Sequence, residues 1–267
     1  MTADAKLAVL IDADNTRPGV VQALLTEVAT YGTAHVKRAY GDWTGPNLKG
    51  WKEQLLAWSI QPVQQFAYTT GKNATDAAMV IDAMDLLYTG RLDAFCLVSS
   101  DSDFTRLAAR LRESGLTVYG FGERRTPAPF VAACDKFIHL DNLTTDTTPD
   151  RPDTPEHTHP APAPPSPRRD TTLHTLLDQA VDAGSDADGW APLAHVGHII
   201  TTQHPDFDPR TYRHAKLTNL VEATGRFDVD RRYPAEDKPA VVYIRRRPPS
   251  DPNADHDADE THREPDL

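Results

Sequence analysis

The sequence is poor in cysteine and has no long apolar run. Its two cysteines, Cys96 and Cys134, belong to no Cys-x-x-Cys pair and have no histidine at ligand spacing. A disulfide framework and a zinc site are therefore not expected. No apolar stretch approaches the roughly 20 residues of a membrane span, and the first residues carry no apolar signal core. We expect a cytoplasmic protein with no membrane partner.

The motifs of several enzyme classes are also missing. There is no nucleophile elbow around a serine or cysteine, and Gly120-Phe-Gly122 lacks the rest of a dinucleotide fingerprint. No histidine accompanies the acidic clusters described below, so a histidine general acid is not indicated. These absences argue against covalent serine or cysteine chemistry and against a nicotinamide site.

Positive charge is in the minority, because 28 Lys and Arg face 39 Asp and Glu, for a formal net charge of −11. The excess is uneven. Residues 248–267 hold seven acidic residues and one basic residue, whereas 1–143 and 170–247 are close to neutral. Since local fields matter more than the total, the net charge does not exclude a nucleic-acid partner.

Apolar strands alternate with amphipathic helices through the first half of the chain. This alternation predicts an α/β domain over residues 1–143 with a doubly wound parallel sheet. The strands are expected at 6–13, 35–40, 60–66, 93–98, 116–121 and 136–140, and the helices at 18–31, 47–59, 75–88, 103–114 and 129–134.

The second half divides into three parts. Residues 144–169 are rich in proline, which predicts an extended, disordered linker. Residues 170–247 show three helical patterns, the third at 211–221, and then a β-hairpin, which predicts a small α+β domain like a winged helix. Residues 248–267 have too little apolar content to fold and are expected to form a disordered acidic tail.

Acidic side chains follow the apolar runs of the first domain. In a parallel sheet the carboxyl ends of the strands meet at one edge, where ligands bind. Carboxylates crowded there need a hard divalent cation such as Mg²⁺ or Mn²⁺, which would activate a water against a phosphodiester. The competing interpretation is that these acids merely cap helices. The candidate ligands are Asp12, Asp76, Asp101 and Asp103, with Asn15 placed to hold Asp12.

Two further polar residues belong near this edge. Asp14 could point into the site or cap the helix that follows. Lys72, shortly before Asp76, could contact a phosphate.

These acidic motifs resemble the NYN family of PIN-like nucleases. The resemblance lies in Val9-Leu-Ile-Asp-Ala-Asp-Asn15, Lys72-Asn-Ala-Thr-Asp76 and Val98-Ser-Ser-Asp101-Ser-Asp103-Phe104, and it covers about residues 6–141. It implies a metal-dependent endoribonuclease in which the four aspartates bind the metal and Asn15 orients one of them. Asp14 stands where the family varies.

The C-terminal domain resembles an OST-HTH (LOTUS) domain, which implies binding of RNA or of a protein partner. The similar stretches are Leu173-His-Thr-Leu-Leu177, Pro205-Asp-Phe-Asp208, Tyr212-Arg-His-Ala-Lys-Leu217 and Phe227-Asp-Val229. Family members usually have glycine where this chain has Arg213.

Single-stranded RNA is the partner we expect, and self-association is left open. Cations on or before the third helix, including Arg213 and Lys216, and arginines of the hairpin would contact phosphates. The alternative is a solvated helix face. Among the tryptophans, Trp43 is the best candidate for stacking on a base, whereas Trp51 and Trp58 have the spacing of core residues.

Two other functions compete with the nuclease. Asp12-Ala-Asp14-Asn-Thr16 fits the nucleophile motif of haloacid dehalogenase-type phosphatases, but that interpretation leaves Asp76 and Asp103 without a role. A non-catalytic RNA-binding adaptor would keep the fold and the acids without turnover. Asp14→Asn separates nuclease from phosphatase, because only the phosphatase would lose activity severely.

Overall fold

The computed structural model describes residues 5–45, 48–65, 74–144, 165–233 and 239–247. Contacts within the chain divide it into two compact units. The first contains residues 1–165 and 198–215, and the second contains 166–197 and 216–267. No helix among the described residues is long and apolar enough to cross a membrane.

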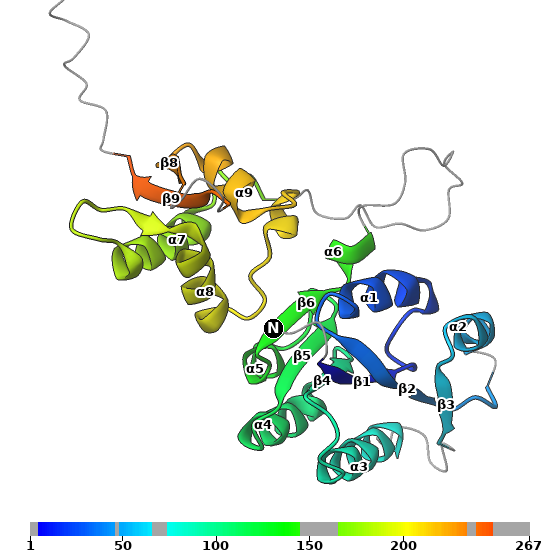
Figure 1. Cartoon of the computed structure of the whole chain (residues 1–267). Coiled ribbons are helices and arrows are strands. Elements are labelled where there is room, and N and C mark those ends of the chain that lie inside the picture. The colour runs from blue at the N-terminus through cyan, green and yellow to red at the C-terminus, as the bar shows by residue number, and fades with distance from the viewer. Residues whose placement is uncertain (1–4, 46–47, 66–73, 145–164, 234–238, 248–267) are drawn as a thin grey trace, which may run out of the picture. The chain divides into compact units, whose positions relative to one another are not determined.

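The first unit is built on a six-stranded sheet in which all neighbouring strands are parallel, in the order β3-β2-β1-β4-β5-β6 (Figure 1). The strands are β1 (Lys6–Asp12), β2 (Thr33–Gly41), β3 (Gln61–Gln64), β4 (Ala94–Val98), β5 (Thr117–Gly122) and β6 (Lys136–His139). The helices are η1 (Pro18–Val20), α1 (Val21–Val28), α2 (Trp51–Ala57), α3 (Ala74–Tyr88), η2 (Ser102–Phe104), α4 (Thr105–Glu113), α5 (Ala128–Ala133) and α6 (Asp141–Thr144).

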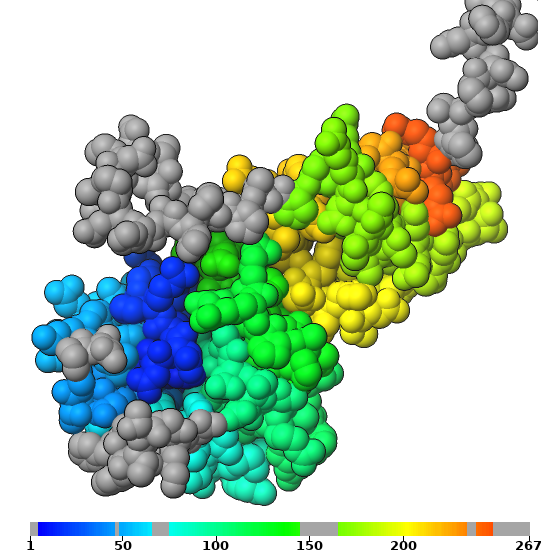
Figure 2. Space-filling view, turned by 180° about the vertical axis from the view of Figure 1, so that it is seen from behind, coloured from blue at the N-terminus to red at the C-terminus, as the bar shows by residue number. Residues whose placement is uncertain are grey.

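Both faces of this sheet are covered, which explains why its central strands are almost wholly apolar. In β1, Leu7 and Val9 point to a core shared with α1 and α2, while Ala8 and Leu10 point to a core shared with α3, α4 and α5. Figure 2 shows the dark blue residues near the N-terminus beside the lighter blue residues that follow them in the chain. The predicted doubly wound α/β fold is confirmed.

The chain reverses its direction of travel across the sheet between β1 and β4. It first runs outward from β1 to β2 and β3, and it then returns to β4 and continues to β5 and β6. Ile11 of β1 lies opposite Val98 of β4, so both strands end at the same level. Their carboxyl ends form the switch point at which open α/β sheets bind ligands.

Residues 166–247 contain the elements of a small α+β region, although residues 198–215, with the end of α8 and η3, belong by their contacts to the first unit. Antiparallel strands in the order β7-β9-β8 accompany three helices. The elements are α7 (Thr171–Gly184), β7 (Ala191–Pro192), α8 (Leu193–Gln203), η3 (Pro209–Tyr212), α9 (Leu217–Thr224), β8 (Phe227–Arg232) and β9 (Val241–Arg246).

Two details of this region differ from the sequence prediction. The third helix begins at Leu217 rather than at Thr211, because Arg213 adopts a left-handed conformation with φ 60° that ends the preceding turn. The hairpin also gains a third, two-residue strand, in which Ala191 pairs with Ile244. A strand of two residues is too short to show the alternation of apolar and polar residues by which strands are predicted.

Candidate metal centre at the switch point

Asp12 ends β1 as a buried carboxylate, with only 1 % of its surface exposed. Its Oδ2 accepts hydrogen bonds from the Asn15 side-chain amide (2.8 Å) and from the Ser99 hydroxyl (2.8 Å). The backbone N–H of Asn15 donates to Oδ1 (3.3 Å). The Asn15 amide therefore holds Asp12, and the bond from Ser99 to Asp12 ties the ends of β1 and β4 together.

Ser99 is a site residue that the sequence analysis did not assign to this centre. Besides donating to Asp12, its hydroxyl accepts the backbone N–H of Asp101 (3.1 Å). It thereby fixes where the chain leaves β4. The signal was present, since Ser99 directly follows an apolar run, but a serine in a loop has many other roles.

Asp101 caps the short helix η2 while also belonging to the acidic cluster. Its Oδ1 accepts the backbone N–H of Asp103 (2.9 Å). Helix capping and metal binding were the two alternative roles for these acids. Asp101 can have both, because the cap uses only its Oδ1 and leaves the other carboxylate oxygen for a metal.

Three carboxylates converge at this point. Asp76, in the first turn of α3, meets Asp101 and Asp103, and one oxygen from each lies within 4.8 Å of the other two. Oxygens on opposite sides of an octahedral Mg²⁺ are about 4.2 Å apart, since each lies about 2.1 Å from the ion. The donor chemistry of the three carboxylates fits a hard divalent cation, and the 4.8 Å limit on their separation lies slightly above that largest distance between two Mg²⁺ ligands.

The electrostatics of the site show how crowded it is. The pKa of Asp76 is raised to about 6, first by burial and then by the charges of Asp12, Asp101 and Asp103. The pKa of Asp12 is also raised, chiefly by burial, although its hydrogen bonds with Asn15 and Ser99 oppose the rise. Asp12 therefore lies close enough to act on Asp76 electrostatically while standing outside the group of three.

Asp14 and Asn15 are both exposed at the edge of the centre. Asp14 Oδ2 accepts a hydrogen bond from the Thr75 hydroxyl (3.0 Å), which links the loop after β1 to the start of α3. Asp14 thus contacts the neighbour of Asp76 instead of capping the helix that follows it. Lys72, expected to contact phosphate, lies outside the described residues.

The cations expected in the C-terminal domain fall into two groups. Arg213 and Lys216 are exposed, and within the described part of the chain they form no ion pair; both precede α9. The arginines beside and within the hairpin are instead held by acids. These pairs are Arg226 and Arg246 with Asp178, Arg231 with Glu222, Arg232 with Asp230, and Arg245 and Arg247 with Asp228.

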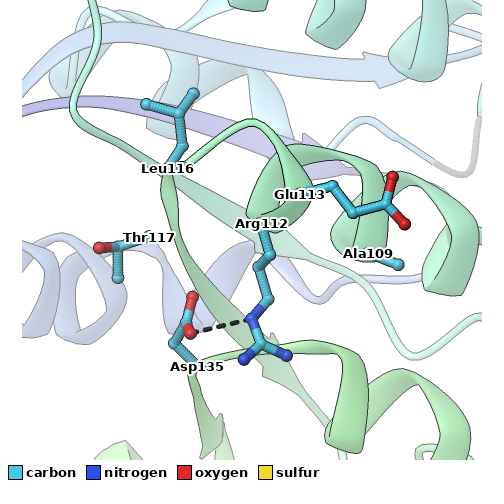
Figure 3. Close-up of a pocket in the computed structure, with 7 residues that line it drawn as sticks. Ala109, Arg112, Glu113, Leu116, Thr117 and Asp135 are labelled. Carbon is cyan, nitrogen blue, oxygen red and sulfur yellow. Dashed lines mark hydrogen bonds and ion pairs between the residues drawn. The ribbon is translucent and has the colours of Figure 1, made fainter.

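The opposite edge of the sheet carries a pocket of about 510 Å³ that we do not assign to the site. In Figure 3, Arg112 and Asp135 point toward each other in this pocket, and Arg112 Nε lies 2.9 Å from Asp135 Oδ1. Asp135 Oδ2 accepts the backbone N–H of Val118 (2.8 Å). This pair fastens the amino ends of β5 and β6, so its role is structural.

A family model of the NYN domain matches residues 6–141. The chain belongs to the NYN family. A model of the OST-HTH/LOTUS domain matches residues 166–239 of this NYN protein, so both resemblances predicted from the sequence are confirmed.

Solved structures add little to the family assignment. The NYN protein is similar to a crystal structure of a protein of unknown function from Vibrio parahaemolyticus, with 18 % identity, coverage of 54 % of this chain and 97 % of the other, and a TM-score of 0.46. A solution structure of an uncharacterised protein from Nitrosomonas europaea shows 27 % identity, coverage of 38 % and 92 %, and a TM-score of 0.27. No curated protein matches the chain.

Proposed function

We propose that this NYN protein is a divalent-metal-dependent endoribonuclease. The observation that carries the proposal is the convergence of Asp76, Asp101 and Asp103 at the switch point between β1 and β4. Three carboxylates that close repel one another, and the pKa of Asp76 is raised first by burial and then by the neighbouring negative charges. A cation that neutralises them would make the arrangement favourable.

The chain's own residues would divide the work. Asp76, Asp101 and Asp103 would hold Mg²⁺ or Mn²⁺, which supplies charge neutralisation at the scissile phosphate and a lower pKa for an attacking water. The buried Asp12 would add negative charge to the site, and its hydrogen bond would keep the Asn15 side chain in position. Ser99 would position the loop that presents Asp101.

The phosphatase alternative is less well supported. It requires Asp12 to attack phosphorus, yet Asp12 is 1 % exposed and its oxygens accept hydrogen bonds from Asn15 and Ser99. It also leaves Asp76 without a task. The RNA-binding adaptor differs from the nuclease only in turnover, so an activity measurement must separate them.

The OST-HTH/LOTUS domain supports RNA as the partner. Within the described residues, Arg213 and Lys216 are cations that no acid neutralises, and we propose that they contact RNA phosphates. The domain limits that we propose are 1–143 for the nuclease, 144–169 for the linker, 170–247 for the second domain and 248–267 for the tail.

The decisive experiment uses circular single-stranded RNA, which has no ends for an exonuclease. It is incubated with Mn²⁺, Mg²⁺ or EDTA and with the wild type, Asp101→Asn or Asp85→Asn. Asp85 is an exposed residue of α3 and provides the same charge change elsewhere. We expect linearisation that needs metal, is lost in Asp101→Asn and survives in Asp85→Asn. Bound but intact RNA in every sample would favour the adaptor.

A further inference from the structure

We propose that a pocket beside the acidic cluster binds one base and the flanking phosphates of the single-stranded RNA, an inference that rests on the proposed function. The pocket has a volume of about 500 Å³, within the about 300–1,000 Å³ of small-molecule sites. It lies after the carboxyl end of β2. The residues that carry the argument are Trp43, Leu48, Leu55 and Pro62, which are apolar, and Lys49 and Lys52.

The aromatic wall of this pocket is held in place before any ligand arrives. Trp43 is half-buried, and its indole Nε1–H donates to the carbonyl of Val63 (2.9 Å). Its ring meets the buried ring of Trp51 edge to face, with centroids 6.5 Å apart. A ring fixed in this way loses little freedom when a base stacks on it, which favours binding.

The loop that carries Trp43 is also fixed. Asp42 Oδ1 accepts hydrogen bonds from the backbone N–H (3.1 Å) and hydroxyl (2.6 Å) of Thr44 and from the side-chain amide of Gln64 (2.9 Å). The Gln64 oxygen in turn accepts the backbone N–H of Trp43 (3.0 Å). Trp43 and its neighbours Asp42 and Thr44 are therefore held in place by the fold.

Gly41 connects the pocket to the acidic cluster. A Cβ atom at this position would lie 2.6 Å from Leu48 Cδ1, in the pocket wall, and 3.2 Å from Asp14 Oδ1. Asp14 is bonded to Thr75, the neighbour of Asp76. Gly41 thus lies between Leu48 in the pocket wall and Asp14 at the edge of the acidic cluster. A single-stranded RNA that passes Asp14 can therefore place a base against Trp43.

The charges of the pocket select the occupant. Lys49 and Lys52 are exposed, and in the part of the chain that the structure describes they form no ion pair. The chain as a whole is acidic, so two uncompensated lysines beside an aromatic ring are complementary to a polyanion with flat bases. Single-stranded RNA combines these features, and its bases are free to stack.

The lysines give the first test, because they are exposed and can be changed without disturbing the core. Binding of single-stranded RNA is measured across a salt series in the Asp101→Asn protein, which keeps the RNA intact. Lys49→Gln with Lys52→Gln should reduce the slope of log affinity against log salt by about 1.4, for two lost phosphate contacts. The control pair, Lys6→Gln with Arg91→Gln, lies at the opposite edge of the sheet and should leave the slope unchanged.

The base contact has its own test, which uses RNAs carrying one abasic site at successive positions. With Trp43 present, one position should weaken binding by roughly 5- to 100-fold, the usual size of a stacking contact. Trp43→Leu retains apolar packing but removes the aromatic face, and it should abolish that position's effect.

The outcomes separate this inference from the proposed function. If circular RNA is cleaved but the lysine pair behaves like its control and no abasic position depends on Trp43, the pocket is not part of the RNA site. If RNA is not cleaved but the lysine pair lowers the salt slope and an abasic position depends on Trp43, the pocket binds RNA and the nuclease assignment is wrong.

Discussion

Asp76 is a carboxyl group of the site whose ionised form is destabilised by burial and by the neighbouring aspartates. Because its pKa is raised to about 6 in the folded protein from 3.8, the folded state holds its proton more tightly than the unfolded state. This carboxyl therefore favours folding below about pH 4 and loses that contribution as the pH rises toward 6.

The first prediction follows for protein freed of metal by a chelator. At pH 7.5, Asp76→Asn should stabilise the protein by about 1 kcal/mol, a figure discounted for solvent screening, and so raise Tm by about 2–4 °C. At pH 4 the two melting curves should coincide. Adding Mn²⁺ should stabilise the wild type more than the variant. An equal gain for Asp85→Asn would show that the effect is not specific to the cluster.

Arg213 carries backbone strain that a glycine at this position would relieve. Its φ of 60° places it in the left-handed region, which costs a non-glycine residue roughly 1–2 kcal/mol. Arg213→Gly should therefore raise the free energy of unfolding by about 0.5–1 kcal/mol after the greater freedom of unfolded glycine is subtracted. Urea denaturation measures this. Arg213→Ala removes the same charge but keeps the Cβ, so an equal gain there would refute the explanation.

At the scale of elements, the hairpin shows how a basic sequence can become a neutral surface. Arg246 of β9 bonds Asp178 and Asp182 of α7, so it joins strand to helix, whereas Lys216 at the start of α9 has no such partner among the described residues. Lys216→Gln should weaken RNA binding and lower the salt slope by about 0.7. Arg246→Gln should mainly lower Tm. If a salt titration showed a lower slope for Arg246→Gln, and a thermal melt showed a lower Tm for Lys216→Gln, these two roles would be contradicted.

The sequence was informative about elements wherever local pattern and global packing agree. Wholly apolar runs such as Leu7–Ile11 predicted buried parallel strands because only a covered sheet accommodates them. The third helix of the second domain was misplaced because a single residue's φ at Arg213 decided it, and no periodicity records a dihedral angle. The ion pairs that neutralise the hairpin arginines join residues up to 68 positions apart and were equally invisible.

The candidate site followed a similar rule. The convergence of Asp76, Asp101 and Asp103 could be expected from sequence because parallel strands bring their carboxyl ends to one edge. Asp12, predicted as a fourth ligand, lies outside this group of three and acts on Asp76 through its charge. The bridge from Ser99 to Asp12 could not be expected, since it depends on the register between β1 and β4. The pocket around Trp43 depends on side-chain directions in a loop, although the ring itself was singled out.

At the scale of the whole molecule, more than half of the net negative charge comes from residues 248–267, where seven acidic residues face one arginine. We predict that this tail competes with RNA for basic surfaces. Deleting 248–267 should tighten RNA binding at low salt, and the gain should fade as salt screens the charges. Fluorescence anisotropy at two salt concentrations tests this, and unchanged affinity at low salt would refute it.

The most direct test of the account is the binding of Mn²⁺, followed by the electron paramagnetic resonance signal of the free ion. The wild type and Asp85→Asn should bind Mn²⁺ alike, and Asp101→Asn should bind at least about 10-fold more weakly. Identical titrations for all three proteins would contradict the claim that Asp76, Asp101 and Asp103 form a metal centre.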